Sequence, residues 1–116
     1  MGDMNVAPAD IDVGIKPENA KRWLKTGKSA FLPEEREWLE TLQGWGLTDS
    51  FRSMNSEDDR SYSWFDYRSR GFEQEPKSGL RIDLILASAP AMANLVGTGI
   101  DFDARAFEKP SDHCPI

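Results

Sequence analysis

The chain has 116 residues, of which 39% are hydrophobic and 10% aromatic, and this composition is typical of one globular domain and excludes a disordered chain. Its 14 basic and 20 acidic residues give a net charge of -6. The excess of acid argues against a protein that binds nucleic acid through its overall charge, so any phosphate-binding surface has to be local.

The single cysteine, Cys114, excludes an internal disulfide and favours a reducing compartment, so we expect a cytoplasmic protein. The start of the chain lacks a basic segment followed by an apolar one. No apolar run approaches the ~18 residues that a membrane helix needs. We therefore expect neither a signal peptide nor a contact with the membrane.

The N-terminal segment begins with Gly2-Asp3-Met4-Asn5, in which a carboxylate and an amide lie two residues apart. Val6 to Pro17 is rich in Pro, Asp and Gly, which predicts a loop. Pro17 suits the first turn of a helix, where no N–H is needed, and a short helix is expected from Pro17 until just before Gly27.

A second helix is predicted from Pro33 to Gly46. Pro33 and the two glutamates after it suit a helix N-terminus. Apolar residues follow at helical spacing, at Trp38, Leu39, Leu42 and Trp45. The tryptophans could form a platform that stacks on bases, but such a stripe is more often core, and we interpret it as core.

Two β-prone runs, Ser61 to Tyr67 and Leu80 to Leu86, are predicted to pair as antiparallel strands. The polar connection between them, Arg68 to Gly79, makes a hairpin with an extended loop of the kind that often contacts substrate. Shorter elements complete the prediction: a turn or helical piece at 47–51, a charged loop at 55–60, a short helix at 89–95 and a strand at 96–104.

The C-terminal segment places Asp112 and His113, the only histidine, between Pro110 and Pro115. A carboxylate can bind a divalent metal, an imidazole titrates near neutral pH, and the prolines stiffen the turn. Taken alone, the pair is more often a solvated surface turn.

Four segments in order, GDMN, SYSWFDYRSRGF, LRIDLILAS and EKPSDHCPI, resemble the exonuclease III family of the endonuclease/exonuclease/phosphatase superfamily. The resemblance runs from Gly2 to Ile116 but matches only the C-terminal half of a family enzyme. It implies an α/β fold in which residues 1–116 are the C-terminal portion of one domain. That domain would be a four-layer αββα sandwich of the DNase I-like type, here incomplete, with mixed or mainly antiparallel strands.

The resemblance also implies a function, that of a Mg²⁺-dependent DNA-repair nuclease. Such an enzyme acts on double-stranded DNA as a 3′-to-5′ exodeoxyribonuclease and abasic-site endonuclease. Mn²⁺ would accept the same oxygen ligands as Mg²⁺. Two alternatives stay open: a non-catalytic module that binds nucleic acid or protein, and a phosphoesterase for a small substrate.

Site residues follow from the same resemblance. Asp3 would orient or deprotonate the attacking water near the metal, and Asn5 would hydrogen-bond the scissile phosphate. Asp3, Asn5 and Asp112 would also supply oxygen atoms to the metal site. Asp3 and Asn5 could instead form only an Asx-turn. Asp83 would accept a hydrogen bond from His113 and fix its tautomer, which leaves Asp112 as a carboxylate on the metal side.

The residues around Asp83 allow another interpretation. Arg81 and Asp83 are two positions apart, so in a strand both side chains would lie on the same face, and that face could be exposed to solvent. An isolated carboxylate in an apolar run is costly, however, and needs a partner. The residues alone leave these two possibilities even.

Trp64 resembles the aromatic residue that family nucleases place near an abasic or terminal nucleotide, with core packing as an equal alternative. Arg68, Arg70 and Lys77 are candidates for phosphate contacts, or else solvated loop charges. Cys114 has no partner at metal-ligand spacing and is expected to be inert.

Family enzymes draw further site residues from their N-terminal half: an asparagine, a metal-binding glutamate and a tyrosine. None of these has a match in this sequence. We therefore expect the chain to have little activity by itself and the missing N-terminal half to be a possible partner.

Overall fold

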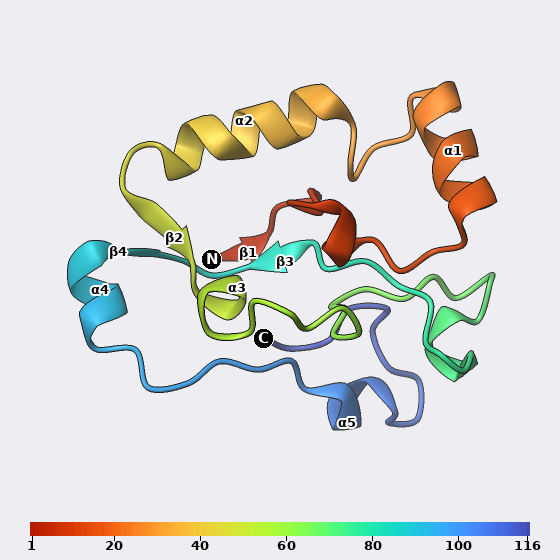
Figure 1. The fold of residues 1–116 in the computed structure, drawn as a ribbon. Helices are drawn as coiled ribbons and strands as arrows, with labels where there is room; N and C mark the ends of the chain where they lie inside the picture. The colour runs from red at the N-terminus through yellow and green to blue at the C-terminus, as the bar shows by residue number, and fades with distance from the viewer.

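A segment in the last third of the chain, residues 80–88, forms the spine of the fold (Figure 1). In the computed structural model, which describes residues 1–116, this segment carries strands β3 (Asp83–Leu84) and β4 (Leu86–Ser88). β3 pairs antiparallel with β1 (Gly2–Asp3), and β4 pairs antiparallel with β2 (Leu47–Asp49). The expected α/β fold with antiparallel strands is confirmed.

The predicted pairing of 61–67 with 80–86 is present only as a single bridge. Trp64 N–H donates to Leu80 O at 2.9 Å, and Leu80 N–H donates to Trp64 O at 2.9 Å. Leu80 also bridges Val13. The prediction of a long hairpin is wrong. β1 and β2, which are distant in sequence, occupy the hydrogen-bonding positions further along residues 80–88.

Both predicted N-terminal helices are present, α1 (Pro17–Thr26) and α2 (Pro33–Gln43), and they lie along one edge of the molecule (Figure 1). α1 ends at Gly27, whose φ of 70° is the left-handed conformation that glycine adopts without strain. α2 ends earlier than predicted.

The interpretation of the tryptophan stripe as core is wrong. Trp38 is 53% exposed and Trp45 is 79% exposed, whereas Leu39 is 1% exposed. Only the narrow side of α2 around Leu39 packs inward, against Val6 and Leu84. The helix therefore packs on the core through one narrow apolar face, and the indole rings of Trp38 and Trp45 lie at the surface.

The remaining helices are short: α3 (Ser50–Met54), α4 (Ala89–Ala93), α5 (Phe102–Arg105) and the single 3₁₀ turns η1 (Asp10–Asp12) and η2 (Gly71–Glu73). The strand predicted at 96–104 is absent. Gly97 and Gly99 weaken a strand, and the Asp101 side chain accepts a hydrogen bond from Ala104 N–H at 3.2 Å, which starts α5 instead.

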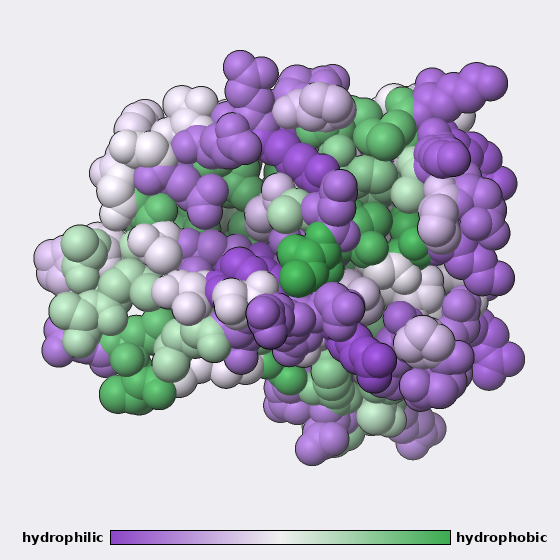
Figure 2. Space-filling model, viewed as in Figure 1, coloured by the Kyte–Doolittle hydropathy of each residue, from purple (hydrophilic) through white to green (hydrophobic).

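The hydrophobic core is divided into three small clusters, and 19 of 116 residues are buried, so much of the apolar content stays at the surface. Figure 2 shows such an apolar area near α4, at the lower left of the view. No helix is long and apolar enough to cross a lipid bilayer.

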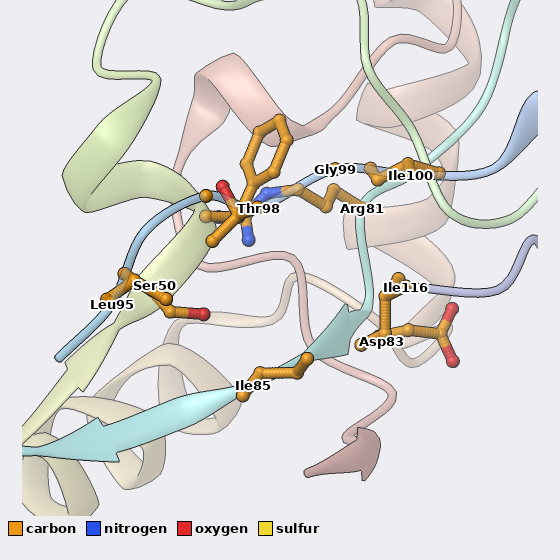
Figure 3. Close-up of a pocket in the computed structure, with 11 residues that line it drawn as sticks. Ser50, Arg81, Asp83, Ile85, Leu95, Thr98, Gly99, Ile100 and Ile116 are labelled. Atoms are coloured by element: carbon orange, nitrogen blue, oxygen red, sulfur yellow. The ribbon is translucent and has the colours of Figure 1, made fainter. Parts of the chain in front are cut away.

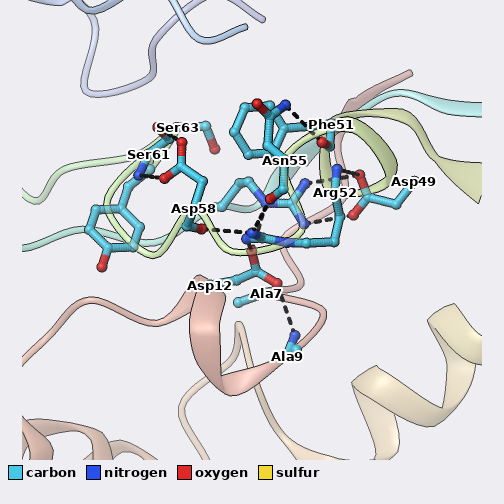
Figure 4. Close-up of polar contacts among 12 residues, drawn as sticks. Ala7, Ala9, Asp12, Asp49, Phe51, Arg52, Asn55, Asp58, Ser61 and Ser63 are labelled. Carbon is cyan, nitrogen blue, oxygen red and sulfur yellow. Dashed lines mark hydrogen bonds and ion pairs between the residues drawn. The ribbon is translucent and has the colours of Figure 1, made fainter. Parts of the chain in front are cut away.

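A buried ion network joins the spine to the N-terminal loop and to β2 (Figure 4). Arg81, only 1% exposed, donates to Asp12 at 2.7 Å and to both carboxylate oxygens of Asp49 at 3.1 and 2.6 Å. Arg52 donates to Asp12 as well, at 2.5 Å. Arg81 therefore does not face solvent as the strand parity suggested, because two carboxylates compensate its burial.

Candidate active site

The centre of the candidate site is the pair His113 and Asp83. His113 Nδ1 lies 2.9 Å from Asp83 Oδ2 and 3.1 Å from Oδ1. The Asp83 side chain is 11% exposed, so the solvent-facing alternative does not hold. The contact that the family resemblance implied is present.

Backbone pairing fixes this geometry. Phe65 N–H donates to Asp112 O at 3.0 Å and Cys114 N–H donates to Ser63 O at 2.7 Å, so the histidine segment is held along the 63–65 segment. The Ser63 hydroxyl accepts N–H bonds from Ile82 and Asp83, both at 3.0 Å. Sequence analysis missed Ser63, and its place inside an aromatic run gave no signal of this role.

Asp3 approaches the imidazole from the other side. It is the register partner of Asp83 in the β1–β3 pair, and its Oδ2 lies 3.9 Å from His113 Nε2. Its Oδ1 accepts the N–H of Asn5 at 2.9 Å, so the Asx-turn is also present. Because the turn uses only one oxygen, the other stays available to a ligand.

Asn5 has a φ of 53°, a left-handed conformation that asparagine tolerates better than most residues. Its side chain is exposed and lines a hollow of about 380 Å³ together with His113, Trp64 and Arg68. The amide is therefore presented to the same space as the histidine.

Asp112 takes a different direction from its neighbour. Its Oδ2 accepts a hydrogen bond from the indole N–H of Trp64 at 3.0 Å. The residues whose ligand atoms lie within 4.8 Å of one another are Asp3, Asp83 and His113, without Asp112. Neighbouring residues of an extended segment project to opposite sides, which separates the two. Its role on the metal side stays a prediction.

Trp64 packs in the core as one of its two interpretations expected, and its contact with a nucleotide stays a prediction. Its ring packs against the cluster formed around Phe31, Leu80 and Ile82, and its half-exposed edge lines the hollow beside His113. It is therefore a core residue with one face toward the site.

The three basic loop residues are dispersed. Arg68 lines the hollow beside His113, and Arg70 is exposed with a φ of 53°. Lys77 Nζ donates to Phe72 O at 2.7 Å, lies 3.6 Å above the Phe72 ring and lines a different hollow. Of the three, only Arg68 shares a hollow with the histidine.

Cys114 is buried, and burial raises the pKa of its thiol to about 11. A thiol so protonated is a poor nucleophile or metal ligand, which agrees with the expectation that it is inert.

The donor set fits a hard divalent cation. Mg²⁺ prefers oxygen ligands and is commonly held by one or two carboxylates, with water completing its shell. Asp3 offers an exposed carboxylate oxygen and Asn5 an exposed amide oxygen. Asp83 and the Nδ1 of His113 hydrogen-bond each other, so Asp3 and Asn5 are the residues left to bind the cation.

A second cavity, of about 300 Å³, lies on the other side of Asp83 (Figure 3). Its lining includes Ile85, Leu95, Ile100 and Ile116. In the figure the Asp83 carboxylate points away from Ser50 and Leu95, and the Arg81 guanidinium is already paired with two carboxylates. This cavity therefore offers apolar volume without free reactive groups.

The known proteins that are similar in sequence to this chain include nucleases. The chain is 56% identical over 116 residues to an exodeoxyribonuclease III of Haemophilus influenzae, and the match covers all of this chain and 43% of that protein. It is 32% identical over 115 residues to a DNA repair nuclease of Danio rerio, covering 99% of this chain and 33% of that protein.

Solved structures agree. A Neisseria protein described as the 3′ phosphatase NExo, bound to a product DNA hairpin, superposes with a TM-score of 0.83 and 42% identity, covering 97% of this chain and 40% of that one. An AP endonuclease of Archaeoglobus fulgidus superposes with a TM-score of 0.81 and 34% identity, with the same shares covered. This chain thus spans less than half the length of these relatives.

The model of the endonuclease/exonuclease/phosphatase family matches residues 1–113, nearly the whole chain. The chain therefore belongs to the endonuclease/exonuclease/phosphatase family.

Proposed function

We propose that this chain supplies the histidine–aspartate part of the active site of a DNA-repair nuclease that hydrolyses phosphodiester bonds. The observation that carries the proposal is the position of His113, with Asp83 at 2.9 Å on one ring nitrogen and Asp3 at 3.9 Å from the other. The names of the relatives, exodeoxyribonuclease III and DNA repair nuclease, support this class of reaction.

The chain's own residues divide the chemistry as follows. Asp83 accepts the Nδ1 proton of His113, which leaves Nε2 as the free nitrogen facing Asp3. The 3.9 Å separation is too long for a direct hydrogen bond and leaves Nε2 and the Asp3 carboxylate free to contact a phosphate oxygen or a water between them. Asp3 orients and deprotonates the water that attacks phosphorus, and the Asn5 amide donates to the phosphate. As the new P–O bond forms, the P–O bond to the leaving oxygen of the DNA breaks, and that oxygen takes up a proton from solvent.

A divalent cation, Mg²⁺ with Mn²⁺ as substitute, would be held by Asp3, with Asn5 beside it, and would stabilise negative charge on the phosphate. Asp112 would join from the metal side only if its second oxygen reaches the ion. The substrate is double-stranded DNA, processed by 3′-to-5′ exonuclease and abasic-site endonuclease activity.

We further propose that residues 1–116 are one portion of a longer domain and have little turnover alone. Two observations support this: the chain spans 43% of the Haemophilus relative, and neither a glutamate nor a tyrosine lines the histidine hollow. The partner would be the remaining half of the domain.

The experiment is a chimera in which this chain replaces the matched 116 residues of the Haemophilus enzyme. We expect Mg²⁺-dependent cleavage of an abasic-site duplex and of a recessed 3′ end. His113→Ala should lower kcat by about 10²- to 10³-fold, as loss of a group that contacts the reacting phosphate does. Asp83→Asn should lower kcat similarly, because Asp83 acts through His113. The double variant should be no worse than the poorer single one, since the two act as a unit.

The control is Asp59→Asn, a substitution of a carboxylate that is 71% exposed and lies outside the site. A chimera that cleaves DNA equally well without His113 would refute the assignment. A chimera that binds DNA without cleaving it would favour the non-catalytic module. Turnover comparable to the Haemophilus enzyme from the 116-residue chain alone would refute the need for a second half.

A second candidate is removal of a 3′-phosphate from DNA, which the description of the Neisseria relative favours. It uses the same attack of water on phosphorus with a different leaving group. A duplex ending in a 3′-phosphate, assayed beside a small aryl phosphate in the same chimera, distinguishes a DNA phosphatase from a small-substrate phosphoesterase.

A further inference from the structure

A β-bulge lies at Ser63 and Trp64, beside the candidate site. The N–H groups of Ser63 and Trp64 both donate to Leu80 O, at 3.0 and 2.9 Å, and Leu80 N–H donates back to Trp64 O at 2.9 Å. Two residues of one segment therefore oppose one residue of the other, which is the defining feature of a bulge. Bulges bend the chain and re-aim side chains, and they are frequent next to active sites.

The Ser63 hydroxyl meets residues 80–88 just beyond the bulge. Its Oγ accepts the N–H groups of Ile82 and Asp83, both at 3.0 Å. Successive N–H groups of a regular strand point to opposite edges, so two that share one acceptor mark an interruption of the strand, and β3 begins only at Asp83. One hydroxyl thus takes the place of a backbone partner for both amides.

The main chain of Ser63 contacts the other member of the catalytic pair. Its carbonyl accepts the N–H of Cys114, the residue after His113, at 2.7 Å, and Trp64 forms a β-bridge with His113 itself. Ser63 is therefore bonded to the Asp83 backbone through its side chain and to the histidine segment through its main chain.

Burial determines what kind of role Ser63 can have. None of its surface is exposed, so it cannot touch a substrate. A buried N–H group without an acceptor is destabilising, so the chain has to move where the hydroxyl is lost. One of the two amides belongs to Asp83, whose carboxylate lies 2.9 Å from His113 Nδ1, so a displacement of this amide passes directly to that hydrogen bond.

We infer that Ser63 is a positioning residue of the candidate active site, whose hydroxyl holds the Asp83 backbone so that the Asp83 carboxylate meets His113 Nδ1. The inference rests on the proposed function and concerns how the reacting geometry is held. Serine suits the position because its oxygen has two acceptor lone pairs, one for each N–H, and its side chain is small enough to be buried at the bulge.

The test uses the chimera that carries this chain and a matched pair of variants, Ser63→Thr and Ser63→Val. Both add a methyl group, but only threonine keeps the hydroxyl, so their difference isolates it. Ser63→Ala removes the hydroxyl without adding volume and replaces the valine variant if that one does not fold. Ser50→Ala is the control, because Ser50 is also buried, 2% exposed, and bonds to Ile85 O through its backbone N–H. Circular dichroism verifies that each variant is folded.

We expect Ser63→Val to lower kcat on an abasic-site duplex by up to about 100-fold and to leave KM within about twofold, because the reacting geometry changes while the DNA contacts do not. Ser63→Thr and Ser50→Ala should keep most of the activity. In a chimera that already carries His113→Ala, Ser63→Val should cause no further loss, since a residue that acts through the pair has nothing left to position. Equal kcat for the threonine and valine variants, or an equal loss without His113, would overturn the inference.

A measurement without turnover separates this inference from the proposed function. His113 is the only histidine of the chain, so nitrogen NMR of the 116-residue chain reports its tautomer without ambiguity. We expect the Nδ1–H form, and Ser63→Val should reduce its share toward the share found in Asp83→Ala. If this share does not change, the inference falls and the nuclease assignment stands. If it does change while the chimera cleaves DNA equally well without His113, Ser63 still positions the pair and the nuclease assignment falls.

Discussion

The indole N–H of Trp64 donates a hydrogen bond to the carboxylate of Asp112 at 3.0 Å, so one contact joins an aromatic side chain that lines the histidine hollow to the histidine turn. It ties together two residues that are 48 positions apart in the sequence and sets the direction of a carboxylate expected on the metal side.

Trp64→Phe keeps an aromatic ring but removes the donor. Because the acceptor is charged, we expect the variant to lose about 1.5 to 3 kcal/mol of unfolding free energy. Asp112→Asn should lose a similar amount, and the double variant should lose less than the sum. Urea unfolding of all three measures this coupling, and strictly additive losses would mean that the hydrogen bond does not form in solution.

Metal binding separates the roles of Asp3 and Asp112. Mn²⁺ broadens amide NMR signals near its site, and we expect broadening centred on Asp3, Asn5 and His113. Asp3→Asn should weaken Mn²⁺ binding at least as much as the ~10- to 100-fold caused by losing a residue that only orients a ligand. Asp59→Asn is the matched control.

Asp112→Asn in the same titration decides whether its second oxygen reaches the ion. An effect as large as that of Asp3→Asn would place Asp112 among the ligands. Broadening that is scattered over exposed acidic residues would contradict a defined metal site.

Arg81 is the residue whose loss should most affect folding. Arg81→Met leaves Asp12 and Asp49 buried with fewer partners, and breaking a buried ion pair from one side costs about 3 to 5 kcal/mol. The control Arg60→Met removes an exposed pair, 86% and 71% exposed, and should change stability by less than about 1 kcal/mol. Similar urea midpoints for the two variants would disprove the structural role of the network.

The lowered pKa of Glu35 makes the stability of the fold depend on pH in a specific direction. Burial by itself would raise its pKa, but hydrogen bonds from the Ser29 hydroxyl and the N–H groups of Ala30 and Leu32 lower it below the ordinary 4.5. A lowered pKa means that the folded state favours the charged form. The stabilisation is therefore present above the ordinary pKa and is lost as the pH falls through the lowered one.

Comparing the chain with Glu35→Gln tests this sign. The difference in unfolding free energy should be constant near neutral pH and should shrink toward zero as the pH falls below 4.5. Glu34→Gln, at the exposed neighbouring position, should show no such trend. A difference that grows on acidification would contradict the assignment.

The sequence by itself determined the local features and indicated which residues meet at the candidate site. Pro17 and Pro33 set the starts of α1 and α2, and Gly27 ended α1, because these residues act through their own backbone. The pairing of Asp83 with His113 could also be anticipated, since a carboxylate within an apolar run needs a partner and the family resemblance named one.

Tertiary structure decided which side chains meet when neither spacing nor propensity specifies a partner. The sequence could not show that Asp112 turns to Trp64, that Arg81 is buried between Asp12 and Asp49, or that Trp38 remains exposed. Each depends on which distant segment occupies the adjacent space. Residues 80–86 were expected to pair with one strand, yet they bond to several segments, because the hydrogen-bonding groups of a central strand are satisfied by whatever backbone packs beside them.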